Sequence, residues 1–519
     1  MGDVWKAGYS IAIFLLSCVF VFKFWWSRRR LRQLGNKIPG PPTLPLLGNI
    51  IQCLGGPRQM FVLFHQQWSQ NEGRCFKLWI GPLLYAIVTS PEDAEQVLVK
   101  TRVLNRDRYT MKVLSRFIGN GLVTCTSQTW KKQRRVIAPS MQYKILDSYI
   151  PVFNKQSRIL VDKLKKFADG NTFNLMSPLV AFTGYTISET AIGAPMNTDF
   201  EEDSIADIIR RAIHMISQRA LKPWLLVDAF YDLTAMGKEQ KKVEEILHKA
   251  GNSLLSSKLE EYREMKSSGS ITDKWMKKAD SIIDNFLRSS ETEGAELDEQ
   301  LLKDEVCTAL IAGTDTTATT LCFTLLLLAL HPTIQTAVFE ELKEVFADDW
   351  ERDVRSEDVK EMKYLSRVIK ETMRLFPVVE IIPRDVDEDI ELKTCTLPAG
   401  SSCMIINYFV HRDPRYFPDP ERFDPDRFLP ERSIDRHPYS YIPFGAGPRI
   451  CVGFKYAEMV MPIVLATVLR KYRVLPVVPY EDLQKLEVGV FLRPETEFLI
   501  KMLPRKGTQF QTTDTAGRK

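Results

Sequence analysis

One cysteine near the C-terminus stands in the most constrained stretch of this sequence. Residues 444–453 read Phe-Gly-Ala-Gly-Pro-Arg-Ile-Cys-Val-Gly, which places Cys451 behind two glycines and a proline. Glycine and proline together force a tight, irregular loop. The residues from Phe454 to Leu469 can form a helix, so the sulfur would lie near a helix N-terminus, where the dipole and nearby positive charge favour a thiolate. The pattern therefore predicts a reactive cysteine.

Two side chains of this loop suit a shielded thiolate beside an anion. Phe444 can cover the sulfur on its apolar side, and Arg449 can reach an anionic group next to it. This arrangement suits an axial cysteine ligand of haem iron, with Arg449 on a haem propionate. The spacing Phe-x-x-Gly-x-Arg-x-Cys-x-Gly resembles the cysteine loop of the cytochrome P-450 family. The alternative is a structural cysteine in a glycine-rich turn, which this spacing disfavours.

The composition of the chain excludes several classes of binding site and partner. The chain has 519 residues, of which 45% are hydrophobic, and a net charge of +5, which does not indicate a nucleic-acid partner. Its nine cysteines are scattered and include no Cys-x-x-Cys pair, and its six histidines include no pair four residues apart. This usage argues against a zinc site or a disulfide framework and for a reducing compartment. If a metal is bound, Cys451 is the predicted ligand.

The N-terminus carries a predicted membrane anchor. Residues 9–26 are mostly apolar, broken by Lys23, and end in two tryptophans that four arginines follow closely. The run is just long enough to span a bilayer, its aromatic end suits the interface, and the arginines place the rest of the chain in the cytosol. A cleaved signal peptide would need a small-residue cleavage site, whereas this run ends in bulky and basic residues. We expect a single-pass transmembrane helix.

The rest of the chain is expected to form one large domain. Dense prolines from Ile38 to Pro45 predict a stiff hinge after the anchor. Helical spacing dominates beyond it, with short strands at 76–80 and 86–88, so we predict a mainly α fold with small β-sheets. The expected division is an anchor with a basic stop-transfer segment at 1–34, a single catalytic domain at 35–505 and a polar tail at 506–519.

A glycine- and threonine-rich segment lies inside the long apolar helix predicted at 304–330. Residues 312–317 read Ala-Gly-Thr-Asp-Thr-Thr. These are poor helix-interior residues, and threonine hydroxyls can bond to preceding carbonyls, so we expect a local opening and a groove. Asp315 and Thr316 supply an acid and an alcohol for a proton relay. The segment resembles the oxygen-activation segment of the same family; the alternative is a kinked core helix with a solvated aspartate.

The resemblance also implies haem-binding roles for three further residues. Trp130 and Arg134 share a helical face within the basic segment 130–135, and in the family this pair donates to a haem propionate. Arg384 matches another propionate-binding position. The remaining basic residues of the segment suit a docking face for an acidic partner such as a reductase, and a solvated basic face is the alternative reading.

A structural ion network is also expected. Glu371 and Arg374 stand three residues apart on one helical face, and Arg422 lies in a following Asp-Pro-Glu-Arg-Phe segment. In the family the counterparts of these three residues form one network. We expect it to contribute conformational specificity and to take no part in catalysis.

The resemblance runs from the hinge to the cysteine loop and is finer than family level. Residues 411–414, 423–430 and 439–444 look like the branch of microsomal fatty-acid omega-hydroxylases, a family-4-like branch. The resemblance implies a cytochrome P-450 fold, haem b ligated by Cys451, and hydroxylation with dioxygen and NADPH electrons delivered through a reductase. It also implies cytochrome b5 as a further partner, contact with membrane lipid, and the endoplasmic reticulum membrane as the location, with the catalytic domain in the cytosol.

The substrate and the exact reaction stay open at this point. A small lipophilic molecule is expected, with a fatty acid as the first choice and steroids, terpenoids or xenobiotics as alternatives. A reductase-independent haem-thiolate isomerase and a haem-based sensor without turnover are less favoured, because Asp315 and Thr316 are both present.

Ala312 marks a departure from the branch. Many of its members carry glutamate at this position, and that glutamate forms an ester with a haem methyl. Alanine has no carboxylate, so the sequence predicts haem that is not covalently attached, and it puts strict selectivity for a terminal methyl group in doubt.

Overall fold

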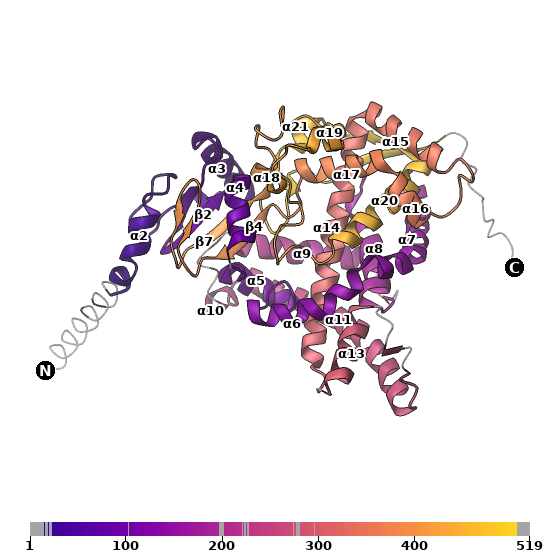
Figure 1. Cartoon of the computed structure of the whole chain (residues 1–519), viewed down its shortest axis with the longest axis horizontal. Coiled ribbons are helices and arrows are strands. Elements are labelled where there is room, and N and C mark those ends of the chain that lie inside the picture. The colour runs from indigo at the N-terminus through magenta and orange to yellow at the C-terminus, as the bar shows by residue number, and fades with distance from the viewer. Residues whose placement is uncertain are drawn as a thin grey trace.

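The computed structural model describes residues 23–101, 103–196, 202–220, 228–272, 281–294 and 296–505, together with residues 15, 19, 222, 225, 275 and 276. Helices dominate this part of the chain, and small sheets lie toward its N-terminal side and at its edge (Figure 1). The prediction of a mainly α fold with small β-sheets is confirmed. The predicted transmembrane segment, apart from residues 15, 19 and 23–26, and the tail at 506–519 lie outside the described residues.

The helices have the following bounds: α2 (Arg29–Gly35), α3 (Gly56–Gln70), α4 (Pro91–Glu95), α5 (Arg108–Ile118), α6 (Ser127–Ile137), α7 (Tyr143–Leu164), α8 (Met176–Ile187), α9 (Glu202–Ala220), α10 (Asp228–Tyr231), α11 (Ala235–Ser267), α13 (Ile282–Glu293), α14 (Glu299–Leu330), α15 (Pro332–Val345), α16 (Ser356–Glu361), α17 (Lys363–Leu375), α18 (Asn407–Val410), α19 (Pro430–Ser433), α20 (Phe454–Lys471) and α21 (Tyr480–Leu483).

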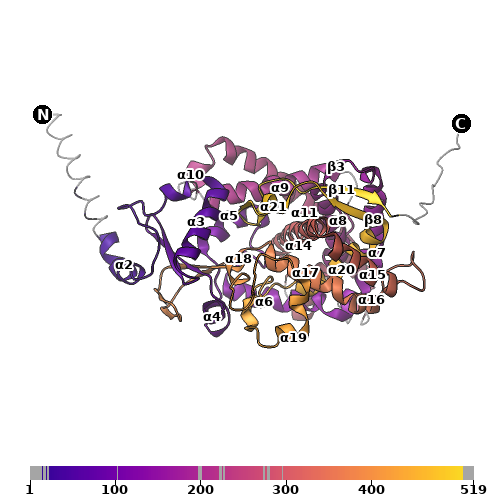
Figure 2. The same ribbon diagram turned by 90° about the horizontal axis from the view of Figure 1, so that it is seen from above.

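Helix α14 runs through the middle of the body, surrounded by α8, α11, α17 and α20 (Figure 2). Asp298 caps its first turn by accepting a hydrogen bond from the Leu301 N–H, and the apolar sequence that follows is buried on nearly all sides. Within the described residues it is the one helix long and apolar enough to cross a membrane, but 83% of its apolar window is buried inside the protein. It is therefore the central core helix.

The glycine–threonine segment does not open α14. The helix is continuous, and threonine hydroxyls donate to carbonyls four residues earlier: Thr316 to Ala312 at 2.7 Å and Thr320 to Thr316 at 2.9 Å. The expected local opening is thus wrong, because the hydroxyl bonds are absorbed within regular helical geometry. Gly313 instead allows close packing, since a Cβ there would lie 2.8 Å from the side chain of Ile187 at the end of α8.

A four-stranded sheet brings the N-terminal part of the domain against the C-terminal part. Its strands are β1 (Phe76–Ile80), β2 (Leu83–Val88), β7 (Ser402–Ile406) and β4 (Ile381–Asp385), in that order, with only the β2–β7 pair parallel. The first two are the predicted short strands and form an antiparallel pair, although β2 begins three residues before the expected Ala86. The pairing of β4 with β7 carries Ile381 to Arg384 toward the centre of the molecule.

The remaining strands form three smaller sheets: β3 (Thr172–Asn174) with β11 (Leu499–Pro504) and β8 (Tyr472–Pro476), β9 (Leu486–Glu487) with β10 (Arg493–Pro494), and β5 (Ile390–Glu391) with β6 (Thr396–Leu397).

The predicted ion network is present with one member changed. Arg374 and Glu371 are fully buried and form two hydrogen bonds of 2.7 and 2.8 Å. The prediction for Arg422 is wrong, because its side chain is exposed and only its backbone carbonyl accepts from Arg374, at 3.3 Å. Arg427 occupies the third place, with Nε 3.3 Å from a carboxylate oxygen of Glu371. Arg427 lies in the short 3-10 turn Pro425–Phe428, which packs against α17 and so brings this arginine to Glu371.

Candidate functional site

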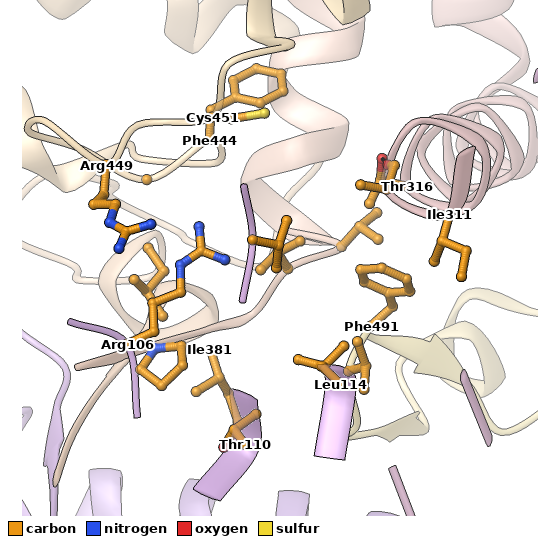
Figure 3. A pocket seen from close by; sticks show the side chains of 18 of the residues that line it. Arg106, Thr110, Leu114, Ile311, Thr316, Ile381, Phe444, Arg449, Cys451 and Phe491 are labelled. Atoms are coloured by element: carbon orange, nitrogen blue, oxygen red, sulfur yellow. Dashed lines mark hydrogen bonds between the residues drawn. The ribbon is translucent and has the colours of Figure 1, made fainter. Parts of the chain in front are cut away.

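A cavity of ≈ 490 Å³ lies between α14, α5, α6, β4 and the cysteine loop, which comprises residues 442–453. Most of its wall is apolar, and Figure 3 shows side chains from α5, α14, β4 and the cysteine loop pointing into one space. Among the described residues that line it, Cys53 and Cys451 carry thiols and Glu305 is the one acid. The cavity is therefore suited to a large apolar ligand with a few polar groups.

The cysteine loop is held in the shape that its glycines predict. Gly445 and Gly447 have positive φ angles of 74° and 69°, and a side chain on Gly447 would overlap the Leu98 carbonyl. The Cys451 N–H donates to the Phe444 carbonyl at 2.9 Å, which closes the loop before α20 begins. In Figure 3 the Phe444 ring lies beside the Cys451 sulfur.

The Cys451 thiol is exposed to the cavity and otherwise surrounded by protein. Burial raises its pKa above the usual value, while the Gly453 N–H and the charges of Arg134 and Arg106 act in the opposite direction. The expected preference for thiolate is therefore not met by the protein alone, because the loss of solvation outweighs the helix terminus and the cations. A metal ion bound to such a thiol removes its proton.

Arg449 connects the cysteine loop to the segments that precede α5 and α6. Its Nε donates to the Leu104 carbonyl at 3.0 Å, and its two terminal nitrogens donate to the carbonyls of Leu122 and Cys125 at 3.4 and 3.3 Å. The guanidinium also lies over the Trp130 ring, 4.5 Å from its centroid. Arg449 and Trp130, predicted from motifs far apart in sequence, are thus in contact.

Three more arginines line the same end of the cavity. Arg134 donates to the Ile450 carbonyl at 3.1 Å and Arg384 donates to the Pro383 carbonyl at 2.8 Å. Arg106, which no motif predicted, lies beside Arg449 in Figure 3. Burial and mutual repulsion lower the pKa of Arg384 to about 9 and that of Arg449 to about 10. This end holds more positive charge than the described residues neutralise.

The donor set fits a haem. A thiol faces the cavity, four arginines and Trp130 gather beside it, and the buried Nε of Arg384 has no hydrogen-bond partner among the described residues. Cys451 would bind the iron, and the arginines and Trp130 would hold the two propionates. No carboxylate lies among the described residues at this end to compete with them; Glu305 is engaged by the Leu122 N–H at 3.1 Å.

Asp315 and Thr316 face different surroundings. Ala312 and Thr316 line the cavity, whereas the Asp315 side chain is fully buried behind α14. Both carboxylate oxygens of Asp315 accept from Nη2 of Arg493 at 2.6 Å. Burial raises the pKa of Asp315, and Arg493 opposes that shift. The structure thus brings the alcohol to the cavity and leaves the acid one helical face away.

The sequence missed Arg106, Glu305 and the wall residue Phe491. Arg106 follows no recognisable motif and lies in an irregular stretch before α5. Glu305 occupies the apolar side of α14, and a buried acid in an otherwise apolar helix was an available signal. Phe491 lies in a turn whose position depends on distant segments, so no local pattern could have indicated it.

Comparison with known proteins agrees with this geometry. The family model described as Cytochrome P-450 matches residues 38–502. Cytochrome P-450 4c3 of Drosophila melanogaster is 33% identical over 515 residues, which cover 96% of either chain. Cytochrome P-450 4V2 of Mus musculus is 36% identical over 495 residues, covering 94% of this chain and 93% of the mouse protein. The human protein of the same name is 32% identical over 511 residues, covering 97% and 95%.

Proposed function

We propose, from the premise that this chain belongs to the cytochrome P-450 family and is a monooxygenase with a cysteine-ligated haem, that it hydroxylates a fatty acid. The observation that carries this proposal is the cavity, whose wall is apolar beyond the cysteine and arginine end. The resemblance of residues 423–430 to the omega-hydroxylase branch supports a fatty acid over a steroid, terpenoid or xenobiotic.

The proposed roles follow from the placement of each side chain. Haem, when bound, supplies the activation of dioxygen. Cys451 would bind its iron, Phe444 would shield the sulfur, and Arg449 would hold a propionate. The further propionate ligands would be Trp130, Arg134 and Arg384. Thr316 would hold a hydrogen bond at the cavity face of α14, and Asp315 would supply protons after releasing Arg493.

Electrons are proposed to come from NADPH through a reductase, with cytochrome b5 as a further donor. Lys131, Lys132 and Arg135 are exposed on α6, whose opposite face carries the buried Trp130 toward the cavity. A basic surface this close to the site suits an acidic electron-transfer partner. We retain a reductase-independent haem-thiolate isomerase as the alternative; the placement of Thr316 on the cavity favours the monooxygenase.

The test is a metabolite screen of the full-length protein with reductase and NADPH against saturated fatty acids and sterols. Hydroxylated fatty acids that require both reductase and NADPH would support the proposal. If only sterols were oxidised, the proposed fatty-acid substrate would be wrong and a sterol would take its place. Rearrangement of added hydroperoxides without reductase would favour the isomerase.

We also propose that residues 1–34 anchor the domain at 35–505 in the endoplasmic reticulum membrane, with the domain in the cytosol and the tail at 506–519 outside its fold. The long apolar run at 9–26 and the arginines after it support this. The full-length protein should resist carbonate extraction from microsomes, and deletion of residues 1–26 should weaken that resistance. Complete extraction of the full-length chain would contradict the anchor.

A further inference from the structure

The turn at residues 488–492 forms a stretch of cavity wall between β9 and β10. Its first four residues line the cavity, and Phe491 projects into it in Figure 3. The backbone N–H groups of this turn donate to distant parts of the chain: Val488 to the Pro57 carbonyl at 3.4 Å, Gly489 to Glu380 Oε1 at 3.0 Å, Val490 to Ser217 Oγ at 2.9 Å and Leu492 to the Val378 carbonyl at 2.8 Å.

These four acceptors come from three different parts of the fold. Pro57 lies in α3, Ser217 in α9, and the other two in the segment that precedes β4. A turn with so few bonds of its own takes its position from its neighbours. The placement of Phe491 in the cavity is therefore set by contacts that lie behind the wall.

Glu380 is the one acidic side chain among these tethers. It stands between Val379 and Ile381, which both line the cavity, while its own side chain is 1% exposed and does not line it. Its backbone carbonyl accepts from the Asn407 N–H at 2.8 Å, and Asn407 also lines the cavity. Glu380 thus joins three pieces of the wall from behind.

The surroundings of this carboxyl group disfavour its ionised form. No ion pair to it is formed among the described residues, and its Oε2 atom is buried without a hydrogen-bond partner there. Burial raises its pKa to about 8, against the opposing hydrogen bond from the Gly489 N–H and, to a smaller extent, the charge of Arg493, which is already bound to Asp315. An apolar side chain of the same size would avoid this desolvation cost. What an apolar residue could not do is accept the Gly489 N–H.

We propose that Glu380 is a specificity-determining positioning residue, which fixes the 488–492 turn and thereby the place of Phe491 against the substrate. The inference rests on the proposed function only in that the cavity is where substrate binds. When the turn is fixed, an alkyl chain packs against the wall in one position, and only a few of its C–H bonds lie where they can be oxidised. With the turn released, the same chain can settle in several positions.

A matched pair of variants tests this proposal. Glu380→Gln is neutral and keeps an oxygen that can accept the Gly489 N–H, whereas Glu380→Met has similar volume and only a thioether, which is a weak acceptor. We expect Glu380→Gln to keep the wild-type ratio of hydroxylated positions on dodecanoic acid. Glu380→Met should change that ratio about threefold or more, the effect of losing one neutral hydrogen bond, with unchanged haem content and a single cooperative unfolding transition.

A second measurement does not need turnover of a fatty acid. Spectral titration with 1-dodecylimidazole, compared with imidazole, reports contact of an alkyl chain with the wall. Glu380→Met should bind 1-dodecylimidazole about threefold or more weakly and imidazole unchanged. If the wild-type protein does not oxidise dodecanoic acid, the proposed substrate fails while this titration still tests Glu380. Glu388→Ala, which removes an exposed carboxylate eight residues later, serves as the control.

The double variant separates positioning from general destabilisation. If Glu380 acts through Phe491, then Glu380→Met in a Phe491→Ala background should cause no further loss of 1-dodecylimidazole affinity. The proposal would be overturned if Glu380→Met lowered the affinity equally in both backgrounds. It would also be overturned if folded, haem-loaded Glu380→Met kept the wild-type product ratio and the wild-type affinity for 1-dodecylimidazole. A Glu380→Gln variant that behaves as Glu380→Met does would overturn it as well.

Discussion

The two ends of the cavity are held in opposite ways. At the arginine end, charged side chains donate to backbone carbonyls, and Arg449 alone reaches three of them. At the 488–492 turn, backbone N–H groups donate one bond each to neutral acceptors such as Ser217 Oγ. Hydrogen bonds from charged donors are worth about 1.5–3 kcal/mol and neutral ones about 0.5–1.5 kcal/mol. The cofactor end is thus held firmly, and the wall at the turn can be displaced by the loss of a single bond.

The largest effect should come from the cysteine at the firmly held end. Cys451→Ala should abolish the red-shifted Soret band that thiolate ligation gives to the reduced, carbon-monoxide-bound protein, because no other described cavity thiol stands in the cysteine loop. Cys53→Ala removes the other cavity-lining thiol and should keep the band. A Cys451→Ala protein that retains the band would show that the cofactor end is assigned wrongly.

A smaller effect is expected midway between the two ends, on α14. Thr316→Ala should keep haem but lower the product formed per NADPH by about tenfold or more, with peroxide or water released instead, because it removes the hydroxyl at the cavity face. The ratio of product to NADPH consumed is the measurement. Thr336→Ala, whose hydroxyl makes the same bond to a carbonyl four residues earlier on the exposed side of α15, is the control. Unchanged coupling would place the relay elsewhere.

The weakly held end should respond to pH. The pKa of Glu380 is raised to about 8 in the folded protein, against about 4.3 when unfolded. Below about pH 4 the carboxyl group is neutral in both the folded and the unfolded state. As pH rises toward 8, the unfolded state loses this proton first, so the free energy of unfolding of the wild type falls. The stability advantage of Glu380→Gln over the wild type should grow across this window by at most about 1.4 kcal/mol per pH unit.

Urea unfolding at pH 5, 6.5 and 8 measures this advantage. Glu388→Ala, which removes an exposed carboxylate, should show no comparable trend. A pH-independent difference between Glu380→Gln and the wild type would mean that the buried carboxyl titrates near its ordinary value, and the contrast between the two ends would lose one of its supports.

The smallest effect should come from Ala312. Denaturing chromatography should release unmodified haem from the wild-type protein, because a methyl group cannot form an ester. Ala312→Glu should, after turnover, hold part of the haem covalently and raise the ratio of terminal to in-chain hydroxylation, while Ala312→Gln should do neither. Covalently bound haem in the wild type would contradict the prediction of free haem. An unchanged ratio of terminal to in-chain hydroxylation in Ala312→Glu would reject only the predicted effect on selectivity.

The cofactor end was largely predictable because its main features are local. Phe444, Arg449 and Cys451 lie within eight residues, and the glycines between them leave the loop little choice of shape. Trp130 and Arg384 required the family resemblance, since nothing in their own surroundings marks them. Arg106 was missed because its position depends on how an irregular stretch packs against the arginines already in place.

Two features of the structure that the sequence did not reveal have a common physical source. Asp315 and Thr316 are adjacent in sequence, but neighbouring residues on a helix point about 100° apart, so one faces the cavity and the other Arg493. Glu380 and Gly489 are 109 residues apart and meet only in the folded chain. Spacing predicts what lies on one face of a helix or in one loop, and it does not predict which remote segments a buried acid will tether.

Arg493 begins β10 directly after Leu492, so the cation that holds Asp315 is the next residue after the turn that shapes the cavity wall. A substitution that reshapes this turn for a new molecule also shifts the partner of the acid behind α14. Selection on this chain therefore acts on both traits together. On the proposed role of Asp315, a descendant that gains a new substrate by changing the turn is expected to show a changed ratio of product to NADPH consumed, until a second change restores the original spacing of Arg493 and Asp315.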